Sequence, residues 1–370
     1  MTRSSRKLIA IMLASLLWAG CSGVQNATDT QAGEAQNNTA QEKAPSLPSI
    51  VTTTQDGLEI YTINPLGAIP AIDSPEFLLP GEADQEYSDG EYVVGVVIGD
   101  DARAYSISLL SNHEIVNDTV GGQKIAVTWS PLCFTALAYS RDVKGVEVNF
   151  GVSGKLINND LVMYDRHTGS LWSQLLGKAV YGPMTGAALE YIPAQYTSWA
   201  DWKSQYPNTL ALRKGFFGES DKYLNYYFSE ELGLMGETTS DDRLHPKTFV
   251  FGVELNEEHA AFPLSVLRQE PVLNYENGPA QFLVIYNGKS SAAYAFDRQV
   301  DGQLLTFEWV ENGFPFITDL ETGTLWNGRT GEAVEGVLAG SRLTRIKGTL
   351  SFWFAWKDFY PETHIYELEN

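Results

Sequence analysis

The chain has 370 residues and a formal net charge of -21, and 12% of its residues are aromatic. A surface this acidic repels phosphate backbones, which excludes nucleic acid as a partner. Only two cysteines are present, so a disulfide framework is excluded as well. The length is sufficient for two domains, each with its own core.

The first 20 residues predict an export signal. A basic start is followed by the apolar run 8–18, which is too short for a lasting membrane span, and then by Ala-Gly before Cys21. This pattern resembles the lipobox of bacterial lipoproteins, in which the cysteine carries diacylglycerol, although Trp18 replaces the usual Leu. With Ser22 after the cysteine, the resemblance implies a lipid anchor in the outer membrane, facing the periplasm. An ordinary secreted protein is the alternative.

Residues 21–50 predict a flexible tether, because they contain almost no large apolar side chain that could offset the entropy of ordering. From residue 51 onward strand patterns dominate. Two β-hairpins are predicted, one pairing 92–98 with 103–106 and one pairing 115–120 with 124–129 through Gly-Gly. Further predicted elements are strands at 135–139, 146–150 and 161–164, and a short helix that begins after Ser198 and ends before Pro207.

The strand pattern recurs later in the chain at a constant offset. The period is far longer than that of a solenoid, which indicates two domain-sized copies. We predict a first repeat domain at 51–210, a connecting segment at 211–247 and a second repeat domain at 248–370. The expected fold is α+β and β-dominated, with two tandem divergent copies of a mostly antiparallel β unit, each ending in a short helix. Matching residues include Gly95 and Gly252, Asn117 and Asn274, Arg141 and Arg298, Asp165 and Asp319, Trp172 and Trp326, Trp199 and Trp353, and Trp202 and Trp356.

A residue shared by both copies serves the scaffold, whereas a residue found in one copy is free to serve a site. The shared tryptophans are therefore predicted to pack in the core rather than to bind a ligand. The shared Asp165 and Asp319 each precede Thr-Gly, which predicts a turn. The second copy is expected to support the first.

Three residues with reactive or metal-binding side chains occur in the first copy alone. His113 aligns with Glu270, Cys133 with Ser290, and Met163 with Ile317. The first copy also keeps the longer segment 151–160, where small residues surround Lys155. That segment predicts either an anion-binding loop or an ordinary hairpin loop.

The stretch from Val94 to Asp142, which contains the motifs His113 to Gly122 and Pro131-Leu132-Cys133, resembles a bacterial family catalogued as domain of unknown function 3179. The later motifs Phe150 to Leu156, Asp160 to Asp165 and Ser170 to Gln174 share this resemblance. The resemblance covers nearly the whole mature chain and implies no activity. Many members of that family carry a second cysteine at the position of Ser130 and Gly where Phe134 stands. This chain lacks both, so the resemblance does not extend to a dithiol redox couple.

Three functions remain open. The first is a binding or scaffold module of the cell envelope, lipid-anchored through Cys21, with an unidentified small-molecule or protein ligand near Cys133 and His113 and no known cofactor. The second is a thiol enzyme or redox protein with Cys133 as nucleophile, His113 as base and Lys155 at an anion site. The third is a copper protein with His113, Cys133 and Met163 as ligands, for which the turn residue His167 is the nearest second histidine.

Overall fold

The computed structural model describes residues 50–218, 220–255, 257–310 and 313–368, all within one compact unit. The predicted signal peptide, Cys21 and the tether up to residue 49 lie outside these residues. Strands account for 44% and helices for 11% of the chain, which confirms a β-dominated fold. No helix in the described part is long and apolar enough to span a bilayer.

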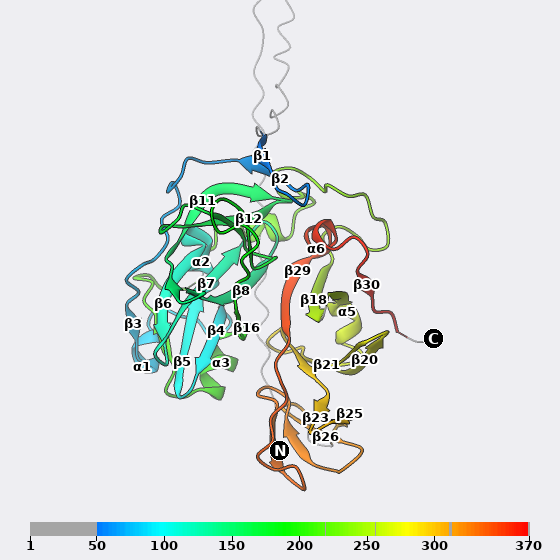
Figure 1. Ribbon diagram of the computed structural model, residues 1–370. Coiled ribbons are helices and arrows are strands. Elements are labelled where there is room, and N and C mark those ends of the chain that lie inside the picture. Colours follow the sequence, from blue (N-terminus) through cyan, green and yellow to red (C-terminus); the bar gives the residue numbers. More distant parts are fainter. Residues whose placement is uncertain (1–49, 219, 256, 311–312, 369–370) are drawn as a thin grey trace, which may run out of the picture. The chain divides into compact units, whose positions relative to one another are not determined.

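The first half contains four sheets, with strand orders β1-β2-β11-β12-β13-β14, β10-β9, β15-β8-β7-β6 and β16-β4-β5-β17-β3 (Figure 1). Its strands are β1 Ile50–Thr53, β2 Glu59–Thr62, β3 Phe77–Leu78, β4 Tyr92–Ile98, β5 Asp101–Ser106, β6 Ile115–Val120, β7 Gln123–Ser130, β8 Thr135–Ser140, β9 Asp142–Val143, β10 Val146–Glu147, β11 Phe150–Ile157, β12 Asp160–Asp165, β13 Leu171–Ser173, β14 Lys178–Tyr181, β15 Tyr191–Ile192, β16 Ala194–Ser198 and β17 Leu210–Leu212. Its helices are α1 Pro80–Ala83, α2 Ile107–His113 and α3 Trp199–Gln205.

The second half contains the sheets β29-β18-β19-β30, β20-β21-β22, β23-β24 and β25-β26-β27-β28. The short helix α4 Leu224–Tyr227 lies in the segment between the halves. The second-half elements are β18 Phe249–Leu255, β19 Glu258–Pro263, α5 Leu264–Leu267, β20 Val272–Asn277, β21 Ala280–Asn287, β22 Ala292–Asp297, β23 Gln299–Val300, β24 Gln303–Leu304, β25 Phe307–Trp309, β26 Phe316–Asp319, β27 Leu325–Asn327, β28 Glu332–Glu335, β29 Lys347–Phe352, α6 Trp353–Phe359 and β30 His364–Ile365.

Local sequence explains the tight turns. Gly121 and Gly122 both have positive φ, as a two-residue hairpin turn requires, and they join β6 to β7. Asn158 and Asn159 do the same between β11 and β12, since Asn tolerates this conformation better than most residues. Both predicted hairpins and the helix after Ser198 are confirmed, and the Ser198 hydroxyl caps α3 by accepting from Asp201 N.

Two predictions about local structure are wrong. Residues 151–157 form strand β11 rather than a loop, because they pair with β12 and β2, and only Asn158-Asn159 makes the turn. The strand predicted at 146–150 is two elements, the short β10 and the start of β11. Small residues suggested a loop at 151–157, and alternating apolar residues suggested one strand at 146–150, whereas pairing with neighbouring strands decided both outcomes.

Matching residues of the two halves make matching contacts. A Cβ added at Gly95 would lie 2.2 Å from the ring of Trp202, and one at Gly252 would lie 2.3 Å from the ring of Trp356. The indole nitrogen of Trp172 donates to Asp165 and that of Trp326 donates to Asp319. All these tryptophans are buried, so the prediction of a core role is confirmed. The duplication itself stays a prediction from the sequence.

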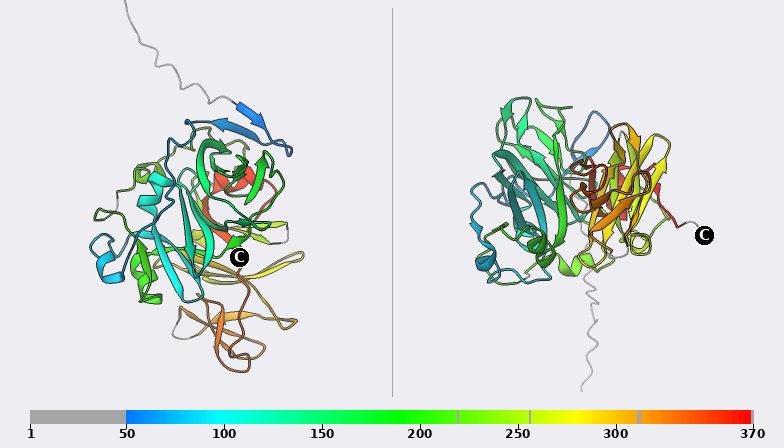
Figure 2. Two further views of the ribbon diagram at one scale, coloured as in Figure 1. Left: turned by 60° about the vertical axis from the view of Figure 1, so that its left-hand side comes forward. Right: turned by 90° about the horizontal axis from the view of Figure 1, so that it is seen from below.

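The two halves share one large apolar core, which contains β7 and β8 residues of the first half and β18, β21 and β29 residues of the second. Strands β8 and β29 lie side by side, and the Thr349 hydroxyl contacts both the amide and the carbonyl of Ala136. Figure 2 shows the blue-to-green strands and the yellow-to-orange strands as two neighbouring groups. The turn after β7, which carries Cys133, lies at this contact.

Candidate functional site

Cys133 lies in the turn between β7 and β8 and is fully buried. Its carbonyl accepts hydrogen bonds from Phe352 N at 3.0 Å and from the Ser351 hydroxyl at 3.2 Å. The next residue, Phe134, has a φ of 61° and packs edge-on against Trp129 and Phe249. The second half therefore holds the cysteine turn in place.

The Cys133 thiol is neutral in this setting. Burial raises its pKa well above the usual value, and the nearby Asp160 carboxyl acts in the same direction, opposed in part by a hydrogen bond from Ser130. A thiolate nucleophile requires the opposite shift. The sulfur lies 3.8 Å from the carbonyl oxygen of Asn158, its hydrogen-bond acceptor.

The other predicted site residues have partners elsewhere. His113, the last residue of α2, contacts the carbonyl oxygen of Pro70 through Nδ1 at 2.7 Å. Lys155 donates to the Thr62 hydroxyl at 2.7 Å, and Met163 is buried opposite Trp172 in a different apolar cluster from Cys133. His167 is exposed in its turn. Over the described part of the chain, no group of three or more His, Cys, Asp or Glu side chains could hold a metal, and the copper site remains a prediction.

A buried carboxyl group that the sequence did not single out lies next to Cys133. Asp160, the first residue of β12, is fully buried, and its side chain accepts from Leu175 N at 2.9 Å. Burial raises its pKa to about 7, although hydrogen bonds from Leu175 and Ser130 favour the charged form. No lysine or arginine in the described ranges forms an ion pair with it. A buried carboxyl without a cation is costly and marks a candidate site.

A hydrogen-bonded chain extends from Asp160 through Thr135 and Gln174 to Thr128. Because the Thr128 hydroxyl donates to Leu137 O, it accepts from Gln174 Nε2 at 3.0 Å. The Gln174 Oε1 then accepts the single hydroxyl proton of Thr135, also at 3.0 Å. The same hydroxyl is the donor toward Asp160 at 3.2 Å, so Gln174 and Asp160 share its one proton. Burial therefore raises the pKa of Asp160 against hydrogen bonds, including the one from Thr135, that favour the charged form.

Glu114 is a second carboxyl of this kind. It ends α2 in the left-handed conformation with a φ of 59°, which a non-glycine residue rarely adopts. Its side chain is buried, which raises its pKa to about 7; Lys222 lowers that pKa and Asp160 raises it. Glu114 lines a cavity of about 60 Å³, large enough for a few water molecules, together with Ser130, Lys155, Asn159 and Tyr223.

These polar residues occur in the first half alone. Strand pairing supports the offset between the halves, since Ser130 faces Thr135 and Asn287 faces Ala292. Five positions in the second half lack the side chains of this network: Thr128, Glu114, Thr135, Asp160 and Gln174 correspond to Ile285, Pro271, Ala292, Phe314 and Gly328. Comparing the polar residues of the two copies could therefore have found this network from the sequence.

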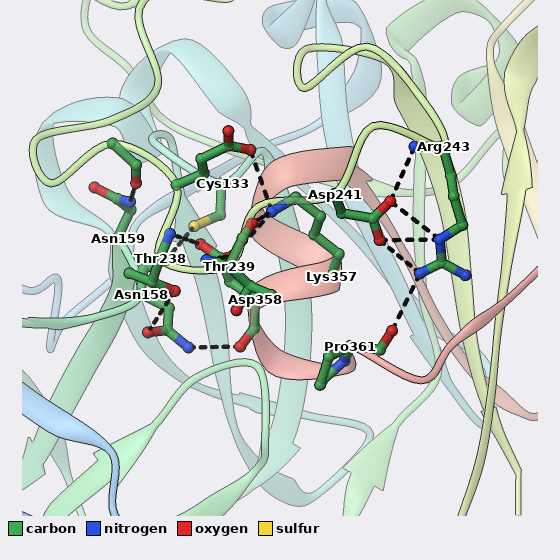
Figure 3. Close-up of polar contacts among 12 residues, drawn as sticks. Cys133, Asn158, Asn159, Thr238, Thr239, Asp241, Arg243, Lys357, Asp358 and Pro361 are labelled. Carbon is green, nitrogen blue, oxygen red and sulfur yellow. Dashed lines mark hydrogen bonds and ion pairs between the residues drawn. The ribbon is translucent and has the colours of Figure 1, made fainter.

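The segment between the halves is hydrogen-bonded to the turn after β11 and to α6 beside Cys133 (Figure 3). The Asn159 side chain accepts from Leu234 N and Met235 N at 2.8 and 2.9 Å. Asp358, in α6, accepts from Thr238 N and Thr239 N at 2.8 and 2.9 Å, while its carbonyl accepts from the Asn158 amide group. The turn after β11, the connecting segment and α6 are thus held together around Cys133.

Lys247 ends the connecting segment near the thiol. Its ammonium group lies 3.6 Å from the ring centre of Tyr226 and 3.9 Å from that of Phe352. Burial lowers its pKa to about 8, while Glu231 and Glu230 act in the opposite direction. Phe134 also borders a separate, mainly apolar cavity of about 270 Å³ at the contact of the two halves.

Comparison with known proteins gives one family match. The family model described as protein of unknown function (DUF3179) matches residues 66–363, which include both halves and every residue of the buried network. The family predicted from the sequence motifs is thereby confirmed. No curated protein and no solved structure shows significant similarity to the chain.

Proposed function

We propose that this chain, which belongs to the DUF3179 family, is a ligand-binding protein of the cell envelope whose binding site is the buried polar pocket of its first half. The observation that carries the proposal is the pair of buried carboxyls, Asp160 and Glu114, each with a pKa raised to about 7 and neither ion-paired within the described ranges. Burying two such groups is unfavourable for folding alone. A role in ligand binding explains why the first half keeps these two carboxyls.

The ligand is a small polar molecule whose N–H or O–H groups donate to the carboxyl of Glu114, which lines the cavity. Asp160 is not a lining residue, and it acts on the site by raising the pKa of Glu114 through its charge. The cavity of about 60 Å³ accepts only a few heavy atoms, and Ser130, Asn159 and Tyr223 add polar groups to its wall. Ligand donors favour the charged form of a carboxyl, so binding near neutral pH releases protons. The site is a proton-linked binding site.

The test is a thermal-shift and calorimetric screen with ammonium, guanidinium, formamide, acetamide, urea and glycerol. At least one compound should raise Tm for the wild type, and the heat of binding should vary with the buffer because protons are released. The shift should be lost in Glu114→Gln and kept in the control Glu308→Gln, an exposed residue of the second half. At a ligand concentration of 100 Kd the stabilisation is about 3 kcal/mol. If no compound gives a Glu114-dependent shift, the chain is a scaffold module instead.

The cellular location is part of the proposal and rests on the sequence alone. The apolar run 8–18 followed by Ala-Gly-Cys supports lipid attachment at Cys21 and an outer-membrane anchor facing the periplasm. Detergent phase separation of cell extracts tests it. The full chain should partition into the detergent phase, and Cys21→Ser should move to the aqueous phase.

The thiol-enzyme and copper hypotheses remain predictions that no contact favours. The raised pKa of Cys133 is unfavourable for a nucleophile, and the polar partners of His113 and Lys155 are Pro70 and Thr62.

A further inference from the structure

A second cavity, of about 590 Å³, lies between the two halves and is lined by arginines. Its walls come from β4 and β16 of the first half and from residues 329–345 of the second. Three arginines at one cavity are unexpected in a chain with a net charge of -21. The lining residues that matter are Arg329, Arg342, Arg345, Gln195, Trp202 and Tyr206.

Arg345 has no carboxylate partner among the described residues. One of its five donors is used by Arg329 O at 3.2 Å, and its guanidinium lies 4.5 Å from the ring centre of Tyr294 and 4.9 Å from that of Phe296. The side chain lies deep in the molecule but keeps some exposure through the cavity. Its remaining donors are available to a ligand.

Two further donors at this cavity lack an acceptor. Gln195 is 7% exposed, and its amide nitrogen has no hydrogen-bond partner. The buried Nε of Arg329 is also without a partner, although its Nη2 pairs with Asp201 at 2.6 Å. Buried polar atoms are normally paired, so unpaired donors on the wall of one cavity indicate a ligand rich in acceptors.

The arginines are specific to the second half. An isolated bridge joins Lys178 to Ala188 in the first half, and the matching bridge joins Glu332 to Arg342 in the second. By the same offset Arg345 corresponds to Tyr191, and Arg329 to Leu175. Because the matching residues of the first half are not arginines, a scaffold role common to both halves does not explain why arginine occurs at these three positions.

From these observations we infer that the cavity is a second binding site, which takes a small organic anion with an apolar body. A carboxylate or phosphate group lies against Arg345, Arg342 and Gln195, since guanidinium groups pair with either in a two-point geometry. The apolar body packs on Trp202, Tyr206 and Phe296. The volume of 590 Å³ is in the range of small-molecule sites.

The experiment measures binding of benzoate, phenyl phosphate, inorganic phosphate and neutral benzamide to the purified protein by calorimetry. We expect benzoate or phenyl phosphate to bind with a Kd below about 1 mM and benzamide not to bind. Arg345→Gln should weaken binding at least about tenfold, the size of one lost charge-assisted contact. The control Arg213→Gln, which removes a half-exposed arginine elsewhere, should leave the Kd unchanged.

Two further variants keep the proposal testable if Arg345→Gln fails to fold. Arg342 is largely exposed and pairs with the exposed Glu332 at 3.2 Å, so Arg342→Gln should fold. Gln195→Leu removes no charge and should fold as well. Both variants should still weaken binding. Equal affinity in the wild type and in Arg345→Gln, binding of benzamide, or binding of inorganic phosphate alone would each overturn the proposal. The outcome does not depend on Glu114 or Asp160, which keeps this test separate from that of the polar pocket.

Discussion

The two halves share their scaffold contacts but carry opposite polar chemistry. The first half buries the carboxyls of Glu114 and Asp160, where the second has Pro271 and Phe314. The second half lines a cavity with Arg329, Arg342 and Arg345, where the first has Leu175, Ala188 and Tyr191. We infer that the second half supplies the arginines of a site at its contact with the first half, in contrast to the expectation that the second only supports the first.

The comparison also separates stability from function. Ile285 and Ala292 replace Thr128 and Thr135 of the buried network without loss of the strand pairing around them, since β21–β22 keeps the register of β7–β8. These two hydroxyls are therefore not needed for that pairing. Four predictions test this separation, from the largest expected effect to the smallest.

Residues shared by the two halves should contribute equally to the free energy of unfolding. Trp172 and Trp326 are both fully buried, both donate to an aspartate and both meet a phenylalanine edge-on. Trp172→Ala and Trp326→Ala should each lower the free energy of unfolding by about 3–5 kcal/mol, as large cavities in a core do. Urea denaturation measures both. A loss below about 1 kcal/mol in either variant would contradict an equivalent scaffold role.

The carboxyl of Asp160 should make the protein less stable as pH rises. Its pKa is about 7 in the folded protein and near 3.8 when unfolded, so the folded state binds the additional proton between these values. Its contribution therefore falls from pH 4 to pH 7 and is constant above that. Asp160→Asn, which keeps an acceptor oxygen for Thr135 and removes the buried charge, should be more stable than the wild type at pH 8 by up to a few kcal/mol.

Urea midpoints at pH 5 and pH 8 measure this difference. The control Asp100→Asn removes an exposed charge from the turn after β4 and should leave the pH dependence of the wild type unchanged. If stability falls with pH as steeply in Asp160→Asn as in the wild type, another titratable group causes the pH dependence. Glu114→Gln should reduce the slope in the same direction, because burial also raises the pKa of Glu114 to about 7.

The thiol of Cys133 should be inert in the folded protein. It is fully buried and its pKa is raised, so a maleimide reagent should label it only when the protein unfolds, at a rate that rises with urea. Cys133→Ser, which inserts the residue found at the matching position 290, should cost about 1–2 kcal/mol. Rapid labelling without urea would support the thiol-enzyme hypothesis. Stoichiometric copper that is lost on Cys133→Ala and Met163→Ala would support the metal hypothesis.

The sequence was sufficient to predict the β-dominated fold, both hairpins and the core role of the tryptophans, because these follow from local patterns and from repetition. It did not predict strand β11, since Gly151, Ser153 and Gly154 are typical of loops and only pairing with β2 and β12 makes them a strand. It identified Cys133 but not Asp160 or Gln174. A comparison of polar residues between the two copies would have selected both, but their burial and the hydrogen-bonded chain that joins them are visible only in the structure.

His113 differs between the halves, and its hydrogen bond within the described residues is to the Pro70 carbonyl rather than to Cys133. His113 corresponds to Glu270, which accepts from the Tyr366 hydroxyl, and both side chains lie at the surface ends of their segments. Because His113 contacts only a backbone carbonyl, His113→Gln should change the free energy of unfolding by less than about 1 kcal/mol. The maleimide labelling rate of Cys133 should be unchanged as well. A changed rate would mean that the histidine acts on the thiol. A difference between matching residues of the two halves would then predict site residues better than their burial does.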